Sequence, residues 1–345
     1  MHPFTETIAL WYEKHGRSLP WRVAPDAYSV WLSEVILQQT TVKQGTDYYL
    51  RFLQQFPTVE ALAAATEDEV LRLWQGLGYY SRARNLHAAA RQVVSMGGFP
   101  TAYKEIRTLR GVGDYTAAAI ASLAFGEPCA VVDGNVYRVL SRYFGLDTPI
   151  DTTAGRKAFA ELADEVLDRQ NPARHNQALM DFGATQCLPR NPDCMVCPLA
   201  AGCAALAEGR TAELPVKSRR IRPVEVNLCY VLLHTPSGLF LRQRPKRGIW
   251  GGLWEIVQAP DFLPQCNEPQ LFIEGCGEGL DLRPLGGFRH QLTHRTIVCQ
   301  AYESCVAEGT DVPGYTFVSW DGLDRYGLPR LIELIIEKWK NKTSE

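Results

Sequence analysis

Four of the ten cysteines stand close together in the sequence, at a spacing that suits one shared metal site. The spacing is C-x6-C-x2-C-x5-C, at Cys187, Cys194, Cys197 and Cys203. Four thiolates at this density favour a soft metal, and from their chemistry alone either zinc or a [4Fe–4S] cluster would fit. The remaining six cysteines are scattered and are expected to be small core residues.

Two carboxylates have surroundings suited to general acid chemistry and to stabilising a cation. Glu34 is the one acid in the apolar run 31–37, and burial among such side chains raises the pKa of a carboxyl group. Asp133 stands between an apolar run and Gly134 at a predicted helix start. Glycoside hydrolysis divides its work between a protonated and an ionised carboxyl group. Taken singly, Glu34 is better explained as an exposed helical glutamate, and Asp133 as an ordinary helix cap.

A glycine turn precedes an alanine-rich segment. Gly111, Val112 and Gly113 lead into the predicted helix that contains residues 117–124. The first N–H groups of a helix lack partners within it, so they bind anions, and a nucleic-acid phosphate is one such anion. By itself the turn is an ordinary helix entry.

Helical periodicity predicts an all-α region over the first two-thirds of the chain. We expect helices over 4–15, 28–56 (kinked near Gly45), 81–94 and 156–167. No alternating strand pattern appears before about residue 225. These positions place Glu34 and Asp133 on or beside helices.

The texture of the sequence changes after a polar, basic stretch. Residues 208–224 are predicted to be a linker between a helical region over 1–207 and a second domain over 225–345. The second domain is expected to be α+β. Its predicted strands are 226–233, 239–241, 287–290, 296–302 and 315–320, and its closing helix is 331–340.

Composition is that of a globular protein, with 46% hydrophobic and 21% charged residues. The beginning of the sequence lacks the basic and apolar pattern of a signal peptide, and no apolar run reaches membrane-spanning length. We therefore expect a cytoplasmic protein with no membrane partner. A net charge of −2 argues weakly against nucleic acid, but basic residues cluster locally over 210–222 and 242–247.

Two motifs together resemble a known superfamily. Leu-x-Gly-Val-Gly at 109–113, followed by Val-Asp-Gly-Asn-Val-x-Arg-Val at 132–139, is similar to the helix-hairpin-helix base-excision glycosylases. The resemblance places the hairpin at about 105–125, and the remaining motifs resemble the adenine glycosylase branch of MutY type. The cysteine spacing over 187–203 matches the cluster loop of that family, which favours a [4Fe–4S] cofactor with a structural and DNA-sensing role.

The resemblance implies a role for each of four residues at the reacting centre. Glu34 matches the acid that protonates adenine N7, and Asp133 matches the carboxylate that stabilises the oxocarbenium-like sugar. Asn135 matches a residue that positions Asp133 and the attacking water. Tyr115 stands where lyase relatives carry a lysine, and a phenol cannot form a Schiff base, so a monofunctional glycosylase is expected.

The resemblance also implies contacts to a duplex from which one base is flipped out. The hairpin residues Gly111, Val112 and Gly113 are expected to grip phosphate. The other expected DNA-binding residues are Leu37, Gln38, Gln39, Thr40 and Tyr79, of which Gln39 and Tyr79 match inserting residues and Thr40 resembles a contact to the opposite base.

Two C-terminal segments, 248–255 and 288–294, resemble the Nudix-like lesion-recognition domain of the same family. The acidic metal signature of Nudix hydrolases is absent, so no pyrophosphatase activity is expected. Thr293 and His294 are the expected lesion-recognition residues, in a Leu-Thr-His sequence where many relatives have Phe-Ser-His. Arg110 replaces the proline common in the hairpin motif.

The sequence therefore predicts a multidomain protein with an all-α glycosylase core, an iron–sulfur loop and an α+β Nudix-like domain. Its expected substrate is duplex DNA with adenine opposite 8-oxoguanine or guanine. We expect a monomer that acts at the bacterial nucleoid, with a linker open to repair or replication proteins. The alternatives are a lyase acting on oxidised pyrimidines, a non-catalytic mismatch sensor and a zinc-stabilised nucleic-acid adaptor.

Overall fold

The computed structural model describes residues 2–23, 25–218, 223–259, 280–292 and 294–343. The chain divides into two compact units. The first contains Met1–Ala64 and Asn85–Arg220, and the second contains Ala65–Arg84 and Ile221–Glu345. Each unit is described separately below.

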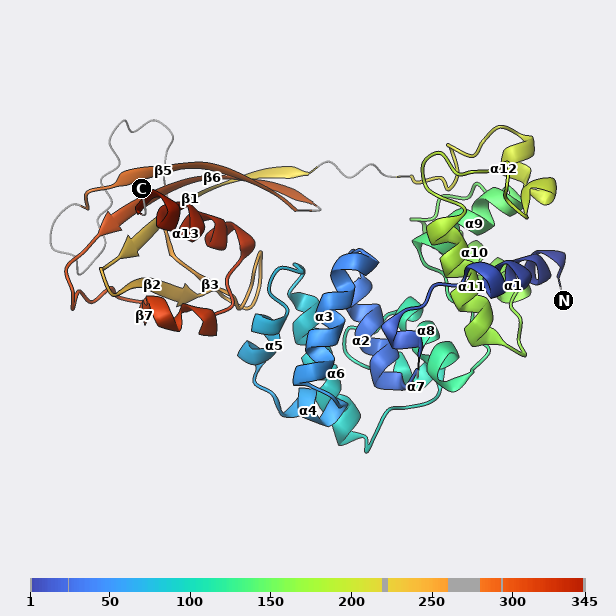
Figure 1. The fold of residues 1–345 in the computed structure, drawn as a ribbon, viewed down its shortest axis with the longest axis horizontal. Coiled ribbons are helices and arrows are strands. Elements are labelled where there is room, and N and C mark those ends of the chain that lie inside the picture. The colour runs from blue at the N-terminus through green and yellow to red at the C-terminus, as the bar shows by residue number, and fades with distance from the viewer. Residues whose placement is uncertain (1, 24, 219–222, 260–279, 293, 344–345) are drawn as a thin grey trace. The chain divides into compact units, whose positions relative to one another are not determined.

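The first unit is helical in its described part (Figure 1). Its helices are α1 (Pro3–His15), η1 (Pro20–Arg22), α2 (Ala27–Leu37), α3 (Val42–Gln55), α4 (Val59–Ala64), most of α6 (Ser81–Ser95), α7 (Tyr103–Ile106), α8 (Asp114–Phe125), α9 (Gly134–Phe144), α10 (Thr153–Glu165), α11 (Pro172–Thr185), η2 (Ala200–Gly202) and α12 (Ala204–Ala207). The all-α prediction for this region is confirmed.

The single helix predicted over 28–56 was wrong, because the chain breaks into α2 and α3. Gln39 has a φ of 59°, which is incompatible with a continuous right-handed helix. The hydroxyl of Thr41 then accepts a hydrogen bond from the amide of Gln44 at 3.3 Å and caps α3. The break leaves residues 38–41 as a loop beside the end of α2.

Packing among five helices brings the two predicted carboxylates into one region. α2 packs against α8, and α11 packs against α1, α8 and α9. Phe4, Ile8, Phe159 and Phe182 are fully or almost fully buried in a core to which α1, α8, α9, α10 and α11 contribute. Burial of several large apolar side chains, each worth about 1.5–3 kcal/mol, holds α8 and α9 in place. α2 is positioned through its packing on α8.

The second unit combines helices with a mixed sheet (Figure 1). Its elements are α5 (Glu67–Leu73), the start of α6, β1 (Val224–His234), β2 (Gly238–Gln243), β3 (Trp254–Glu255), β4 (Val257–Gln258), β5 (Arg283–Gln291), β6 (Arg295–Cys305), β7 (Thr316–Ser319), η3 (Trp320–Arg325) and α13 (Arg330–Thr343). The strands run in the order β3-β2-β1-β6-β5, with β4 paired to β1 and β7 to β2. The α+β prediction is confirmed.

A long hairpin forms one side of this sheet. β5 and β6 pair antiparallel, with Gln291 opposite Thr296, and β6 pairs parallel to β1. The amide of Leu292 donates to the carbonyl of Arg295 at 2.7 Å and closes the hairpin tip. α13 packs on β5 and buries Leu331, Ile332 and Ile335. The hairpin is therefore held by the sheet through β1 and by the packing of α13 on β5.

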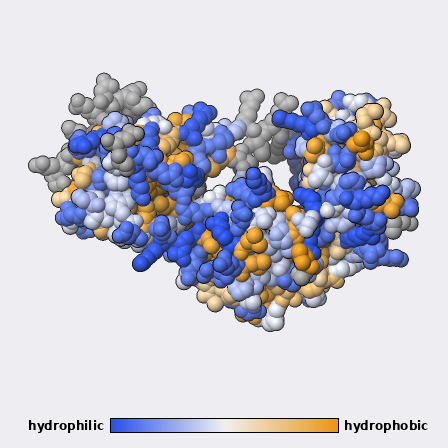
Figure 2. Space-filling model, viewed as in Figure 1, coloured by the Kyte–Doolittle hydropathy of each residue, from blue (hydrophilic) through white to orange (hydrophobic). Residues whose placement is uncertain are grey.

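Hydrophilic side chains cover much of the face drawn in Figure 2, with apolar side chains in smaller groups. Within the described part of the chain, no helix is long and apolar enough to cross a membrane.

Candidate active site and cysteine loop

α2 places Glu34 in an apolar environment. Asp26 caps this helix, and every residue from Ala27 to Ile36 is buried. Glu34 is 8% exposed, and burial raises the pKa of its carboxyl group to about 7. The hydroxyl of Tyr115, on α8, donates a hydrogen bond to Glu34 Oε2 and opposes that rise. A carboxyl group with this pKa carries a proton near neutral pH and can give it to a base.

The entry of α9 holds Asp133 in a different way. Asp133 is the N-cap, and its Oδ1 accepts hydrogen bonds from the amides of Asn135 at 2.8 Å and Val136 at 2.7 Å. Its Oδ2 accepts a third bond from the Asn135 side chain at 2.8 Å. Burial raises the pKa of Asp133 above its usual value, but these donors favour the carboxylate. The predicted cap and the predicted charge stabiliser are thus compatible.

One cavity of about 350 Å³ brings these groups together. The structure places four predicted catalytic residues and four predicted DNA-binding residues around it: Glu34, Tyr115, Asp133, Asn135, Leu37, Gln38, Gln39 and Thr40. Gln38 also donates to the hydroxyl of Thr116 at 3.4 Å, which ties the loop after α2 to α8. An acid, a hydrogen-bonded carboxylate and a loop of polar side chains therefore face one space.

The sequence analysis missed a cationic part of the cavity wall. Arg17 and Arg22 line the cavity, and both bind the buried carboxylate of Asp181 on α11. Arg17 Nε lies 2.8 Å from Asp181 Oδ1, and Arg22 Nη1 lies 2.8 Å from Oδ2. Burial alone would raise the pKa of Asp181, but these arginines hold it below its usual value. The motif Leu-Pro-Trp-Arg at 19–22 is the sequence feature that carries Arg22.

The predicted phosphate-binding turn is well formed but lies outside the cavity lining. Gly111 has a φ of 75°, and a Cβ there would lie 2.6 Å from Asn85 Cβ, so the position favours glycine. Val112 is buried, while Gly113 is exposed as the N-cap of α8. The amide of Arg110 donates to Gln92 Oε1 at 2.7 Å, a bond that a proline could not make. The Arg110 difference thus adds an anchor to the turn.

The four predicted metal ligands lie in a loop to which two arginines of α9 donate hydrogen bonds. Arg142 Nη1 donates to the sulfur of Cys187 at 3.4 Å and to the carbonyl of Leu188 at 2.7 Å. Arg138 Nε donates to the carbonyl of Cys187 at 2.7 Å, and its Nη2 donates to Asn135 Oδ1 at 2.9 Å. A single buried guanidinium therefore connects the first cysteine of the loop to the residue that holds Asp133.

The donor set of this loop suits a soft metal centre. All four cysteines are free thiols, and burial and the neighbouring cysteines raise the pKa of Cys197 to about 11. Four thiols that share one short loop become thiolates together only when a cation offsets their charge. Among the described residues, no three Cys, His, Asp or Glu side chains are close enough to hold a metal ion as they stand. Four thiols in one loop are suitable ligands for an iron–sulfur cluster or for zinc.

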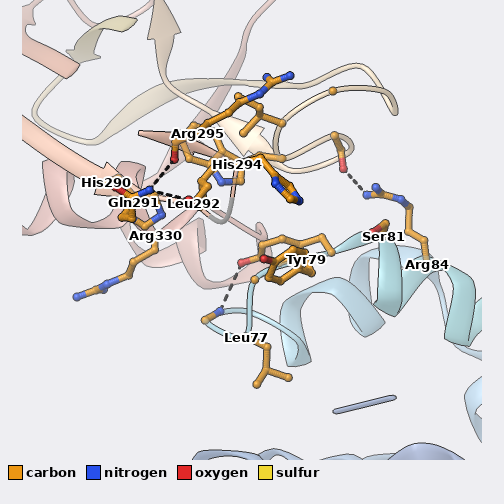
Figure 3. A pocket seen from close by; sticks show the side chains of 17 residues that line it. Leu77, Tyr79, Ser81, Arg84, His290, Gln291, Leu292, His294, Arg295 and Arg330 are labelled. Carbon is orange, nitrogen blue, oxygen red and sulfur yellow. Dashed lines mark hydrogen bonds between the residues drawn. The ribbon is translucent and has the colours of Figure 1, made fainter. Parts of the chain in front are cut away.

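The second unit contains a larger cavity of about 560 Å³, drawn in Figure 3. Tyr79 and His294 both line it, together with residues 290–292 at the hairpin tip. Tyr79 is 42% exposed and has a φ of 48° between the glycine-rich turn and α6. The predicted contact Thr293 lies outside the described residues. The structure thus brings Tyr79 and His294 to one cavity, and neither residue lines the cavity that contains Glu34.

Comparison with known proteins agrees with this arrangement. Residues 32–165 match the HhH-GPD superfamily of base excision DNA repair proteins, and residues 229–338 match the NUDIX domain family. An adenine DNA glycosylase of Buchnera aphidicola subsp. Baizongia pistaciae is 32% identical over 347 residues, covering 98% of this chain and 97% of the relative. The chain belongs to the adenine DNA glycosylase family. A relative from Rattus norvegicus with the same name is 33% identical, covering 92% of this chain and 74% of its own length.

The fold of this adenine DNA glycosylase family member is also found in solved structures. A thermostable thymine-DNA glycosylase has a TM-score of 0.56 at 33% identity, covering 59% of this chain and 95% of that one. The family assignment makes the protein a DNA-binding base-excision repair enzyme with a Nudix-like second domain, as the sequence motifs predicted. These matches identify the family and its fold, and the opposite base, the residue roles and the cofactor follow from the chemistry of the two sites.

Proposed function

We propose that the enzyme excises adenine paired with 8-oxoguanine, and with guanine, by monofunctional hydrolysis of the N-glycosidic bond. The observation that carries this proposal is the pairing of Glu34 and Asp133 around one cavity, the former with a pKa near 7 and the latter hydrogen-bonded as a carboxylate. The relatives are named adenine DNA glycosylases, and we infer from them that adenine is the excised base.

The reaction follows from the chemistry of these two groups. With adenine flipped into the cavity, protonated Glu34 gives its proton to N7, and the C1′–N9 bond breaks as its electrons pass to the base. The carboxylate of Asp133 stabilises the positive charge that develops on the sugar. Water then adds to C1′ and loses a proton, so the products are free adenine and an abasic sugar.

Tyr115 supports hydrolysis without strand cleavage. Its hydroxyl bonds to Glu34, and a phenol at this position cannot form the imine that a lyase needs. Borohydride trapping tests this directly: the proposal expects no covalent protein–DNA complex, and a trapped complex would support the lyase alternative.

Recognition of the opposite base is proposed for the cavity in the second unit. Tyr79 is an exposed aromatic side chain suited to enter a base stack, and the hairpin tip with His294 offers polar groups to an oxidised purine. We assign Thr293 and His294 to contacts with 8-oxoguanine. The hairpin turn with Gly111 and Gly113 is assigned to phosphate.

We also propose that Cys187, Cys194, Cys197 and Cys203 hold a [4Fe–4S] cluster. When bound, such a cluster would stabilise the loop and supply a redox-active centre. The contacts of Arg138 and Arg142 to this loop support a structural role. Iron and sulfide analysis with a visible absorption spectrum tests the cofactor, and stoichiometric zinc without iron would favour the adaptor alternative.

A further inference from the structure

Trp250 has a backbone conformation that its residue type disfavours. Four non-glycine residues among those described have a positive φ: Gln39, Tyr79, Asn191 and Trp250. A φ of 54° is unusual for a bulky side chain and suits glycine far better. Residues held in such conformations gather at functional sites, where the surrounding structure enforces them. Three of these four residues line one of the two cavities described above.

The loop that carries Trp250 is closed by its own backbone. The amide of Arg244 donates to the carbonyl of Leu253 at 2.8 Å, and the amide of Leu253 donates to the carbonyl of Trp250 at 3.1 Å. A Cβ on Gly251 would lie 2.5 Å from the carbonyl oxygen of Lys246, so the loop closes where only glycine fits. The backbone at Trp250 is therefore determined by its neighbours.

A buried ionic group supports this loop from the sheet. Glu255 is 1% exposed and accepts hydrogen bonds from Arg244, from Arg242 at 3.0 Å and from the hydroxyl of Tyr230 at 2.8 Å. Arg244 Nε also donates to the carbonyl of Ile249 at 3.0 Å. The same guanidinium lies 5.9 Å from the centre of the Trp250 ring. One half-buried arginine thus contacts both the loop and the indole.

The indole of Trp250 lines the 560 Å³ cavity that Tyr79 and the hairpin tip also line. Its ring lies 6.1 Å from the His290 ring, and it is only partly buried. Aromatic side chains in nucleic-acid-binding cavities bind bases by stacking, a contact that each base offers through its π face. The strained backbone, the ionic support and the cavity position all apply to this one aromatic side chain.

We propose that Trp250 contacts the purine opposite the excised adenine through the face of its indole ring. The contact depends on the proposed function, since it requires that the second unit reads the opposite base. Trp250 would then contribute to affinity for any base at that position, while the hairpin tip would distinguish 8-oxoguanine from guanine.

The test measures binding of the full-length protein in the Glu34→Gln background, so that the substrate stays intact. One duplex has adenine opposite 8-oxoguanine, and the other has adenine opposite an abasic spacer. Trp250→Gly removes the ring and relaxes the backbone, and Trp250→Leu keeps an apolar side chain against the core without an aromatic face. Trp254→Phe is the control, because Trp254 packs against Tyr326 with ring centres 4.8 Å apart and does not line the cavity.

Both Trp250 variants should bind the 8-oxoguanine duplex about tenfold more weakly, a change of about 1.4 kcal/mol, and bind the spacer duplex as the parent does. The control should match the parent on both duplexes. Equal weakening on both duplexes, or none on either, would overturn the proposed base contact. If the Glu34→Gln parent itself binds both duplexes equally, the proposed recognition of the opposite base by the second unit is wrong. That result is distinct from one in which only the role of Trp250 is wrong.

Discussion

If Glu34 is the acid that protonates adenine, the hydrogen bond from Tyr115 should set the pH range over which the enzyme is active. Tyr115 donates to a carboxylate oxygen, so it stabilises the charged form and lowers the pKa of Glu34. Tyr115→Phe removes this donor and should raise that pKa. A hydrogen bond to a charged group contributes about 1.5–3 kcal/mol, and 1.36 kcal/mol corresponds to one pKa unit, so the expected rise is about 1–2 units.

The proposed mechanism requires the protonated form of Glu34, so the excision rate should fall as pH rises through its pKa. With a pKa of about 7, the wild-type single-turnover rate falls above neutral pH. The Tyr115→Phe variant should retain its rate to a pH about 1–2 units higher. The assay is a single-turnover pH profile on a duplex with one adenine–8-oxoguanine pair, read from the midpoint of the alkaline limb and not from the maximal rate.

Tyr137→Phe is the matched control, because Tyr137 is a half-buried tyrosine of α9 whose ring packs on Phe159, outside the cavity lining. Its alkaline limb should coincide with that of the wild type. An alkaline limb that stays in place, or moves to lower pH, in Tyr115→Phe would refute the reasoning that Glu34 is the acid and Tyr115 its partner.

Three further changes test the same site. Asp133→Asn removes a negative charge that faces the developing cation, so the single-turnover rate should fall by about 10²–10³ with mismatch affinity retained; a wild-type rate would contradict the assignment. The pKa of Glu34 is about 7 in the folded state against 4.5 in the unfolded chain, so its stabilising effect is complete below pH 4.5 and is lost as pH rises through 7. Glu34→Gln should therefore melt higher than the wild type at pH 8 and not at pH 4, and identical melting curves at both would show that Glu34 is not buried as described. Arg138→Gln should lower both the excision rate and the retention of visible absorbance on heating, whereas the exposed Arg156→Gln should change neither; loss of only one property would disprove the link between the cysteine loop and Asn135.

The sequence predicted the site residues that stand out against their local surroundings. Glu34 is a lone acid in an apolar run, and Asp133 precedes a glycine at a helix start, so both were identifiable without tertiary information. Arg22 and Asp181 lie 159 residues apart in the sequence, and only the packing of α11 against the N-terminal region brings them together. Such a pairing leaves no periodic or spacing signal in either segment.

Backbone conformations that depend on tertiary contacts could not be predicted from the sequence either. The run Gln38-Gln39-Thr40 contains no glycine or proline that would end a helix. One helix over 28–56 was therefore the reasonable expectation. The left-handed Gln39 shows that tertiary packing overrides the local preference there. The same holds for Trp250, whose backbone bonds to the amide of Leu253 and whose ring lies beside Arg244, contacts that the sequence does not reveal.

The central claim is that the cavity around Glu34 and Asp133 hydrolyses the glycosidic bond of adenine without cutting the strand. The most direct measurement is a single-turnover assay on a duplex with one adenine–8-oxoguanine pair, with and without hot alkali. Free adenine should be released and the strand should break only after alkali, and Glu34→Gln should show neither. Breakage without alkali by nuclease-free protein, or tight binding without adenine release, would contradict it.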